Sequence, residues 1–368
     1  MGNRDGKLTP VDRLYLQRAY ELAARALGST LPNPPVGAVV VRDGRVVGEG
    51  YHHRAGDAHA EAQALELAGL NARGATLYIS LEPCGHVGRT PPCTDAVIAS
   101  GVARVVAGAL DPTTHGGAQQ LRERGIEVAV GDESAAHDLI EIFGRAIRRS
   151  RPYVALKMAA SLDGFVASRE GVRERLGSPA EERYVRELRT AFDAVMVGAG
   201  TVRVDDPRLT VRPPHDRARP YVRIVVCDRE PVAANSRVFE PLEGYARTIV
   251  LAPRSRLDRF EALRDVSDIL AVESSGDGRL DLMAAIRALR ERDIISVLCE
   301  GGPQLAASLI AAGIVDRIYW SIAPRLMRSA NAVPALSGAD LAGIALQFDR
   351  TARIGDDVIL SGTLCSAD

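Results

Sequence analysis

The sequence predicts an α/β protein of two domains, and three observations support this fold class. Short runs of aliphatic and β-branched residues alternate with helix-like segments along most of the 368 residues, which is the pattern of sheets covered by helices. A chain of this length usually forms two domains or one large one. The alternation pauses in a basic stretch at residues 142–152 and then starts afresh. We therefore expect domains at residues 1–146 and 147–368; the alternative is a charged helix face within a single domain.

The first half begins with a predicted helix and a hairpin. Thr9 suits a helix N-cap, Pro10 the first helical position and Asp12 an acidic third position, so we expect a helix that ends near residue 27. In residues 36–50, Asp43 and Gly44 suit a tight turn between two strands. The alternation continues with helices at residues 58–68, 94–101 and 119–124 and with strands at residues 75–80, 104–111 and 127–130.

The second half opens with a strand at residues 153–161. Ser178, followed by Pro179 and Glu181, predicts a capping box for a helix that ends near residue 192. Short β-branched runs bounded by turns predict buried strands at residues 194–200, 223–228, 248–252 and 296–302. A helix at residues 304–313 and antiparallel strands at residues 315–324 and 356–364 complete the chain.

Composition and charge limit the class of protein. The formal net charge of −1 lacks the basic field that nucleic-acid binding requires, so no nucleic-acid partner is expected. Five scattered cysteines favour a reducing compartment over a disulfide framework. The first ten residues contain no apolar segment of a secretion signal, and no apolar run reaches about 18 residues. We expect a soluble, cytoplasmic protein without a membrane partner.

One group of residues predicts a metal centre. His59, Cys84 and Cys93 offer one imidazole and two thiolates, which suits Zn²⁺ with a fourth position open for water. Glu61 lies two residues after the histidine and Pro83 directly before the first cysteine, an order typical of zinc-dependent deaminases. The two cysteines here enclose eight residues, a wider spacing than in that pattern. The alternative is a buried histidine with two inert core cysteines.

These residues predict hydrolytic deamination of an amidine-like carbon. Glu61 is the candidate proton carrier between water and the departing amine. In a purely structural zinc site it would be an ordinary first-turn helix residue. The surrounding loops are rich in hydrogen-bonding groups, which together suggest a polar substrate that carries a phosphate. These groups belong to Asn33, His52, His86, Arg89 and Thr90.

At this point the sequence resembles a known family along nearly its whole length. The segments PNPPVGAVV, GYHHRAGDAHAE and SLEPCGHVGRTPPC resemble the deaminase half of the bifunctional deaminase/reductase family of riboflavin biosynthesis. The segments RPYVALKMAASLDG, VGAGTVRVDDPRLTVR and LCEGGPQL resemble its reductase half, in the same order and spacing. The resemblance implies a cytidine-deaminase-like three-layer domain followed by a dihydrofolate-reductase-like domain. It also implies deamination of 2,5-diamino-6-(5-phosphoribosylamino)pyrimidin-4-one and then reduction of the ribosyl group to ribityl by NADPH.

The resemblance assigns roles by matching position. In the first half, His59, Cys84 and Cys93 would bind zinc, Glu61 would donate a proton, and the five loop residues above would line the pyrimidine-phosphate site. In the second half Lys157 would be catalytic; the matched substrate positions are Arg189, Leu209, Arg212 and Glu300. The cofactor positions are Ala159, Thr201, Asp205, Gly302, Pro303 and Gln304, joined by Arg175 and by Arg229 as a contact for a 2′-phosphate.

Elementary chemistry supports part of this assignment. Arg189 and Arg212 suit bidentate pairing with a phosphate, although either could be a solvated surface arginine. The glycine-rich turn after Glu300 suits a phosphate close to a helix N-terminus. Without the resemblance, Lys157 and Asp163 would be interpreted as an ordinary ion pair beside a strand end.

The second half also departs from the family. Arg173 replaces a serine, and Arg175, Leu176 and Gly177 replace a Trp-Ile-Thr run. One alternative is therefore an active deaminase with an inactive or altered reductase half. Others are a nucleic-acid editing deaminase and a regulatory protein with structural zinc. The apolar strands of the second half make a homodimer or a higher homo-oligomer plausible.

Overall fold

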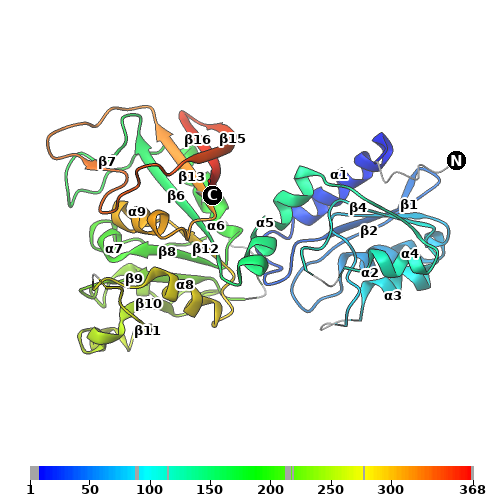
Figure 1. The fold of residues 1–368 in the computed structure, drawn as a ribbon, viewed down its shortest axis with the longest axis horizontal. Helices are drawn as coiled ribbons and strands as arrows, with labels where there is room; N and C mark the ends of the chain where they lie inside the picture. The colour runs from blue at the N-terminus through cyan, green and yellow to red at the C-terminus, as the bar shows by residue number, and fades with distance from the viewer. Residues whose placement is uncertain are drawn as a thin grey trace. The chain divides into compact units, whose positions relative to one another are not determined.

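The computed structural model describes residues 8–87, 91–113, 116–211, 217, 219–276 and 278–365. The chain divides into two compact units, and each is described by itself (Figure 1). The first runs to Ser150 and the second starts at Arg151. Helix α5 (Ser134–Arg149) covers most of the basic stretch at residues 142–152, and the division between the units falls within that stretch, after Ser150.

The first unit is a three-layer sandwich. Its sheet has the order β2-β1-β3-β4-β5, in which β1 is antiparallel to β2 and β3, and β3, β4 and β5 are parallel. Helices α1 and α5 cover one face, and α2, α3 and α4 cover the other (Figure 1). The elements are α1 (Pro10–Ala24), β1 (Gly37–Arg42), β2 (Arg45–Tyr51), α2 (Ala60–Ala68), β3 (Thr76–Ile79), α3 (Cys93–Ser100), β4 (Arg104–Ala107), α4 (Ala118–Glu123) and β5 (Glu127–Val130).

The local signals in this half are confirmed. Thr9 and Asp12 form a capping box: Thr9 N donates to Asp12 Oδ2 at 2.9 Å, and Asp12 N donates to Thr9 Oγ1 at 3.1 Å. The helix ends at Ala24, three residues earlier than expected. Asp43 and Gly44 both have positive φ, which matches a two-residue hairpin turn.

The second unit contains a nine-stranded sheet with the order β11-β10-β9-β8-β12-β6-β13-β16-β15. The first seven are mutually parallel, whereas β16 is antiparallel to β13 and β15. The strands are β6 (Tyr153–Ser161), β8 (Ala194–Gly198), β9 (Val222–Val226), β10 (Thr248–Pro253), β11 (Ser267–Val272), β12 (Ser296–Cys299), β13 (Arg317–Ala323), β15 (Leu346–Ile354) and β16 (Asp357–Leu364). The helices are α6 (Pro179–Thr190), α7 (Ala199–Asp205), α8 (Leu282–Arg290) and α9 (Pro303–Ala311), and β7 (Phe165–Ala167) pairs with β14 (Val333–Pro334).

Two expectations for this half need correction. The strand expected at residues 315–324 is antiparallel to β16, but it is parallel to β6. Strand β11 was not predicted, because its run SDILAV carries an aspartate and lies at the edge of the sheet. Among the described helices, none is long and apolar enough to cross a membrane.

The order of the strands creates a topological switch point between β8 and β12. Strands β8 and β12 are neighbours, but the chain leaves β8 through α7 toward β9 and leaves β12 through α9 toward β13, on the other side. In open parallel sheets, ligands bind outside the carboxyl ends of the strands where the connections diverge in this way. This rule therefore predicts a binding site at the edge of the sheet formed by the residues that follow β8 and β12.

Candidate active sites

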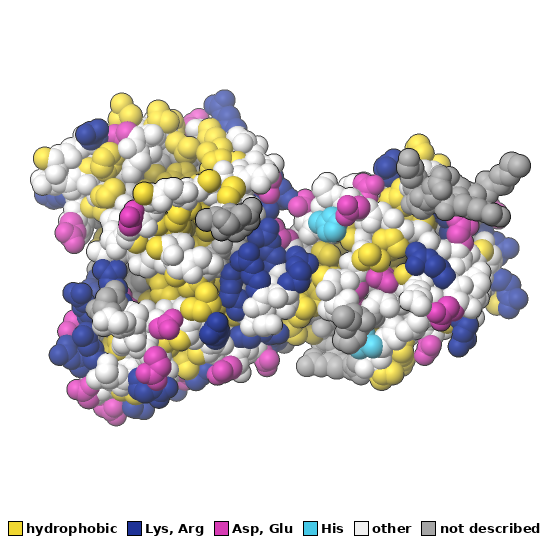
Figure 2. All heavy atoms as spheres, viewed as in Figure 1, with side chains coloured by type: hydrophobic (Ala, Val, Ile, Leu, Met, Phe, Trp, Pro, Cys, Tyr) yellow, Lys and Arg dark blue, Asp and Glu magenta, His cyan; other side chains and the backbone are white. Residues whose placement is uncertain are grey.

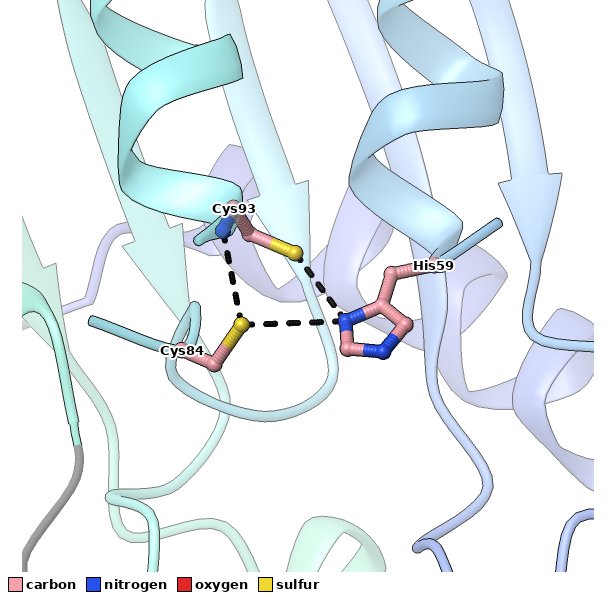
Figure 3. A group of neighbouring side chains, drawn as sticks. All are labelled: His59, Cys84 and Cys93. Carbon is pink, nitrogen blue, oxygen red and sulfur yellow. Dashed lines mark hydrogen bonds between the residues drawn. The ribbon is translucent and has the colours of Figure 1, made fainter. Parts of the chain in front are cut away.

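In the first unit, three elements bring His59, Cys84 and Cys93 together. His59 is the N-cap of α2, Cys93 is the first residue of α3, and Cys84 lies in the loop after β3, bridged to Gly116. Figure 3 shows the three side chains pointing toward one another from these elements. Their candidate ligand atoms all lie within 4.8 Å of one another.

The distances fit a zinc ion. His59 Nδ1 lies 3.1 Å from Cys93 Sγ and 3.7 Å from Cys84 Sγ. Tetrahedral zinc with ordinary bond lengths to sulfur and nitrogen separates such ligand atoms by about 3.5 Å. The described part of the chain adds no fourth histidine, cysteine or carboxylate to the group. Three ligands with an open position are typical of catalytic zinc sites, and four protein ligands of structural ones.

A helix N-terminus favours a thiolate here. The backbone N–H of Cys93, the first of α3, donates to Cys84 Sγ at 3.4 Å. Hydrogen bonding from the Cys93 thiol and from His59 lowers the pKa of Cys84. Thiolates are the form that binds metal, so these interactions favour the metal-binding form of Cys84.

Glu61 is held beside the three ligands. It is 3% exposed, in the first turn of α2, and its carboxylate interacts with the Cys93 thiol. Burial raises the pKa of Glu61 to about 7. The turn is fixed by glycine: a Cβ added at Gly50 would lie 2.6 Å from Ala60 O, and one at Gly48 only 2.1 Å from Ala64 O. Helix α2 therefore packs directly on the backbone of β2.

The expected substrate residues of this half are only partly brought together. Asn33 Nδ2 lies 3.1 Å from His52 Nε2, and the His52 ring meets the His59 ring edge-on at 5.0 Å. Burial lowers the pKa of His52, which favours the neutral ring. His86 is exposed, two residues after Cys84. Arg89 and Thr90 lie outside the described residues.

One residue of this site was not predicted. Glu82 accepts hydrogen bonds from the backbone of Asp111 at 3.0 Å and of Ala118 at 2.8 Å, and so ties the loop after β4 to the loop that carries Cys84. Its only sequence signal is its position two residues before Cys84.

In the second unit, two adjoining cavities of about 300 and 240 Å³ share several lining residues. Lys157, Arg175 and Asp205 line both, Arg189 and Leu209 line the larger, and Ala159 lines the smaller. Six of the residues expected for this half thus surround one hollow.

Arg189 and Glu300, which were both expected at the substrate, pair with each other. Arg189 makes its bidentate pair with Glu300, through Nε at 2.5 Å and Nη2 at 2.7 Å, and Nη1 donates to Thr210 O at 2.7 Å. Burial alone would raise the pKa of Glu300, but the Arg189 charge outweighs it and holds the pKa below its usual value. Arg189 therefore clamps the cavity loop next to Leu209, which has a positive φ of 53°. Arg212 lies outside the described residues.

Lys157 does not pair with Asp163. Its Nζ lies 2.8 Å from Glu181 Oε1. Asp163 instead accepts hydrogen bonds from the Ser161 hydroxyl and from the backbone N–H groups of Met327 and Arg328. These bonds close the turn after β6.

The expected cofactor residues gather only in part. A Cβ at Gly302 would lie 3.2 Å from Thr201 Oγ1, so the turns after β8 and β12 adjoin, with Pro303 and Gln304 opening α9. Arg175 is exposed and pairs with Glu182 at 2.9 Å. Arg229 is exposed beyond β9 and lines neither cavity.

Comparisons with known proteins cover both units. Residues 10–109 match the family model of the cytidine and deoxycytidylate deaminase zinc-binding region, and residues 152–360 match that of the RibD C-terminal domain. The chain is 40% identical to the riboflavin biosynthesis protein RibD of Escherichia coli and 38% to that of Aquifex aeolicus, over 95% of this chain and 98% of each relative.

Solved structures agree with these matches. Acinetobacter baumannii RibD (form 1) is 32% identical with a TM-score of 0.83 and covers 97% of this chain and 99% of its own. The deaminase/reductase of Thermotoga maritima is 35% identical with a TM-score of 0.84 and covers 96% of this chain and 99% of its own. The predicted fold classes of both halves are confirmed, and the alternatives of an editing deaminase, a regulatory zinc protein or an altered reductase half gain no support. The chain therefore belongs to the RibD family of riboflavin biosynthesis, as a bifunctional enzyme with a zinc-dependent deaminase domain and an NADPH-dependent reductase domain.

Proposed function

We propose that the first unit deaminates 2,5-diamino-6-(5-phosphoribosylamino)pyrimidin-4-one and that the second reduces the ribosyl group of the product to ribityl. The observation that carries the first step is the convergence of His59, Cys84 and Cys93 beside the buried carboxyl group of Glu61. In the first reaction water adds to the ring carbon that carries the 2-amino group, and that group leaves as ammonia.

Glu61 carries the proton in this proposal. When bound, zinc acts as a Lewis acid that makes water a nucleophile near neutral pH. Glu61 accepts a proton from the attacking water and delivers it to the substrate, so that the amine leaves as ammonia. The side chain is buried, so the carboxyl group lies away from bulk water. The paired Asn33 and His52 offer the substrate oriented polar groups beside His59. We assign His86, Arg89 and Thr90 to the pyrimidine-phosphate end of the site.

In the reductase half, Lys157 is the proposed catalytic residue. When bound, NADPH would supply the hydride that reduces C1′ of the sugar, and the C1′–O4′ bond would open. Lys157 holds a proton at Nζ on the cavity wall, for the departing sugar oxygen. Glu300 and Arg189 fix the loop that presents Leu209, and Arg212 is assigned to the substrate phosphate.

We assign the cofactor to the edge of the sheet at the carboxyl ends of β8 and β12. Thr201 and the turn of Gly302, Pro303 and Gln304 adjoin there, at the N-terminus of a nine-residue helix that suits a phosphate. Ala159, Arg175 and Asp205 would face the reacting end of the cofactor, and Arg229 its 2′-phosphate; these last assignments rest on family position. Substitution of these residues, followed by measurement of the NADPH affinity, tests the assignments.

A coupled assay tests the two reactions. Purified protein with zinc should release ammonia from the diaminopyrimidine substrate and then oxidise one NADPH per product molecule. Glu61→Gln should keep one zinc ion and lose ammonia release, whereas Glu66→Gln, on the exposed side of the same helix, should leave both unchanged. Ammonia release at the normal rate by Glu61→Gln would overturn the assignment.

We also propose the domain limits, the assembly and the location. The deaminase domain ends with α5 and the reductase domain follows it, in a cytoplasmic homodimer or higher homo-oligomer; the limit expected at residue 146 falls inside α5, which ends at Arg149. Edge strand β15 exposes Leu346 and Phe348, and hydrophobic side chains gather on the face in Figure 2 over the part of the second unit that holds β6, β13 and β16. Light scattering tests this assembly: Phe348→Glu should lower the measured mass, and an unchanged dimer would exclude this surface.

A further inference from the structure

The buried ion pair of Lys157 has features that the proposed reaction leaves unexplained. Lys157 Nζ and Glu181 Oε1 lie 2.8 Å apart, and their side chains are only 14% and 5% exposed. Lys157 comes from the middle of β6 and Glu181 from the first turn of α6. Both line the two cavities, so this pair forms part of the wall against which a substrate would lie.

Glu181 does not make the capping hydrogen bond that its sequence position predicts. In a capping box the acidic residue would accept a hydrogen bond from the backbone of Ser178. Only half of the box forms: Glu181 N donates to Ser178 Oγ at 3.2 Å. Ser178 N donates instead to Asp357 Oδ2 at 2.8 Å, from β16. Because Asp357 completes the cap, the Glu181 carboxylate can turn toward Lys157.

Gly177 makes room for this carboxylate. A Cβ at position 177 would lie 2.3 Å from Glu181 Oε2 and 2.8 Å from its Cδ, closer than any real contact. The backbone of Gly177 has no positive φ that would itself require glycine. The absence of a side chain is therefore explained by the space that the Glu181 carboxylate occupies.

The nearby carboxylate of Glu300 does not pair directly with the Lys157 ammonium. Its two oxygens are both engaged by the Arg189 guanidinium, and it acts on Lys157 only through its charge. Among the described residues, Glu181 is the one carboxylate that forms an ion pair with the Lys157 ammonium, a contact of opposite charges that lacks the geometry of a hydrogen bond. A lysine side chain has four rotatable bonds, so an ammonium without such a partner would sample many positions.

We propose that Glu181 is a positioning residue of the reductase site, which holds the Lys157 ammonium at one place on the cavity wall. Asp357 and Gly177 support it, the first by capping α6 in its stead and the second by leaving space. This inference rests on the proposed role of Lys157. It predicts a specific requirement for a carboxylate at this point, beyond the packing of a side chain.

The test uses the full-length, zinc-loaded enzyme and measures NADPH oxidation with the deaminated substrate. Glu181→Gln keeps the side-chain shape, and it should lower kcat by about tenfold to a hundredfold, the usual cost of a misplaced catalytic group, with KM changed far less. Glu187→Gln, exposed on the same helix, is the matched control. Ammonia release by the first domain of each variant, together with thermal unfolding, reports on folding in the same samples.

A relocation experiment separates positioning from packing. Glu181→Ala should lose activity, and Gly177→Asp/Glu181→Ala should regain part of kcat, because the new carboxylate is attached within 3 Å of the old one. A double variant that folds and is no more active than Glu181→Ala would overturn the inference, as would an unchanged kcat in Glu181→Gln. Lys157→Met separates the catalytic role of Lys157 from the positioning role of Glu181. Full kcat in Lys157→Met would overturn the proposed role of Lys157. An inactive Lys157→Met beside a fully active Glu181→Gln would overturn the positioning role alone.

Discussion

Gly50 is a position at which a single methyl group should impair the deaminase without touching its ligands. A Cβ there would lie 2.6 Å from Ala60 O, 2.7 Å from Gln63 Cβ and 2.9 Å from Ala64 N. An ordinary contact needs about 3.4 Å, so Gly50→Ala must move the first turn of α2 away from β2 by about 0.8 Å. This turn carries His59 on one side of Ala60 and Glu61 on the other.

The magnitude follows from the precision that catalysis needs. A displacement of about 1 Å in a catalytic group can cost a hundredfold in rate, so we expect Gly50→Ala to lower kcat for ammonia release by about tenfold to a hundredfold. Zinc content is measured on the same protein, because His59 moves with the turn. NADPH oxidation with the deaminated substrate should stay at the wild-type rate, since the reductase lies in the other unit.

A matched control carries the same methyl group into open space. Gly276 has no atom within 4 Å of its added Cβ and no positive φ, so Gly276→Ala should leave both activities unchanged. Wild-type ammonia release in Gly50→Ala would refute the reasoning, because it would mean that the contact between α2 and β2 does not fix the metal ligands.

Three further outcomes are expected. Burial alone would raise the pKa of Asp12, but hydrogen bonds from Arg104 and Thr9 outweigh it and lower the pKa to about 2 from 3.8. The pair should therefore add about 2 kcal/mol to the free energy of unfolding above pH 4, lost as the pH falls toward 2; Asp12→Asn should lack this dependence in acid denaturation. Cys93→Ser should lose zinc on dialysis, measured by metal analysis, and retention of one zinc ion per chain would contradict the three-ligand site. Tyr245→Phe removes the hydroxyl that accepts from Val211 N at 2.6 Å. Since such a bond is worth about 1 kcal/mol, the reductase KM should rise about fivefold, and an unchanged KM would show that this loop is held by other contacts.

Structural features that depend only on neighbouring residues could be predicted from the sequence. The capping box of Thr9 and Asp12 and the turn at Asp43 and Gly44 are local, so they were predicted and are present. The grouping of His59, Cys84 and Cys93 was also predictable, because their order and the intervening Glu61 carry a chemical pattern that few other functions require. The same holds for the alternation of strands and helices, which fixes an α/β class before any contact is known.

The ion-pair partner of each charged group could not be predicted from the sequence, because it depends on the assembled fold. Arg189 could equally bind a phosphate or a carboxylate, and only the fold brings Glu300 from 111 residues away to occupy it. Glu181 has the position of a capping residue, but Asp357, 179 residues from Ser178, displaces it toward Lys157. Local geometry sets backbone hydrogen bonds over three or four residues, whereas a buried charge selects the nearest opposite charge in space, and that neighbour is defined only once the sheets are assembled.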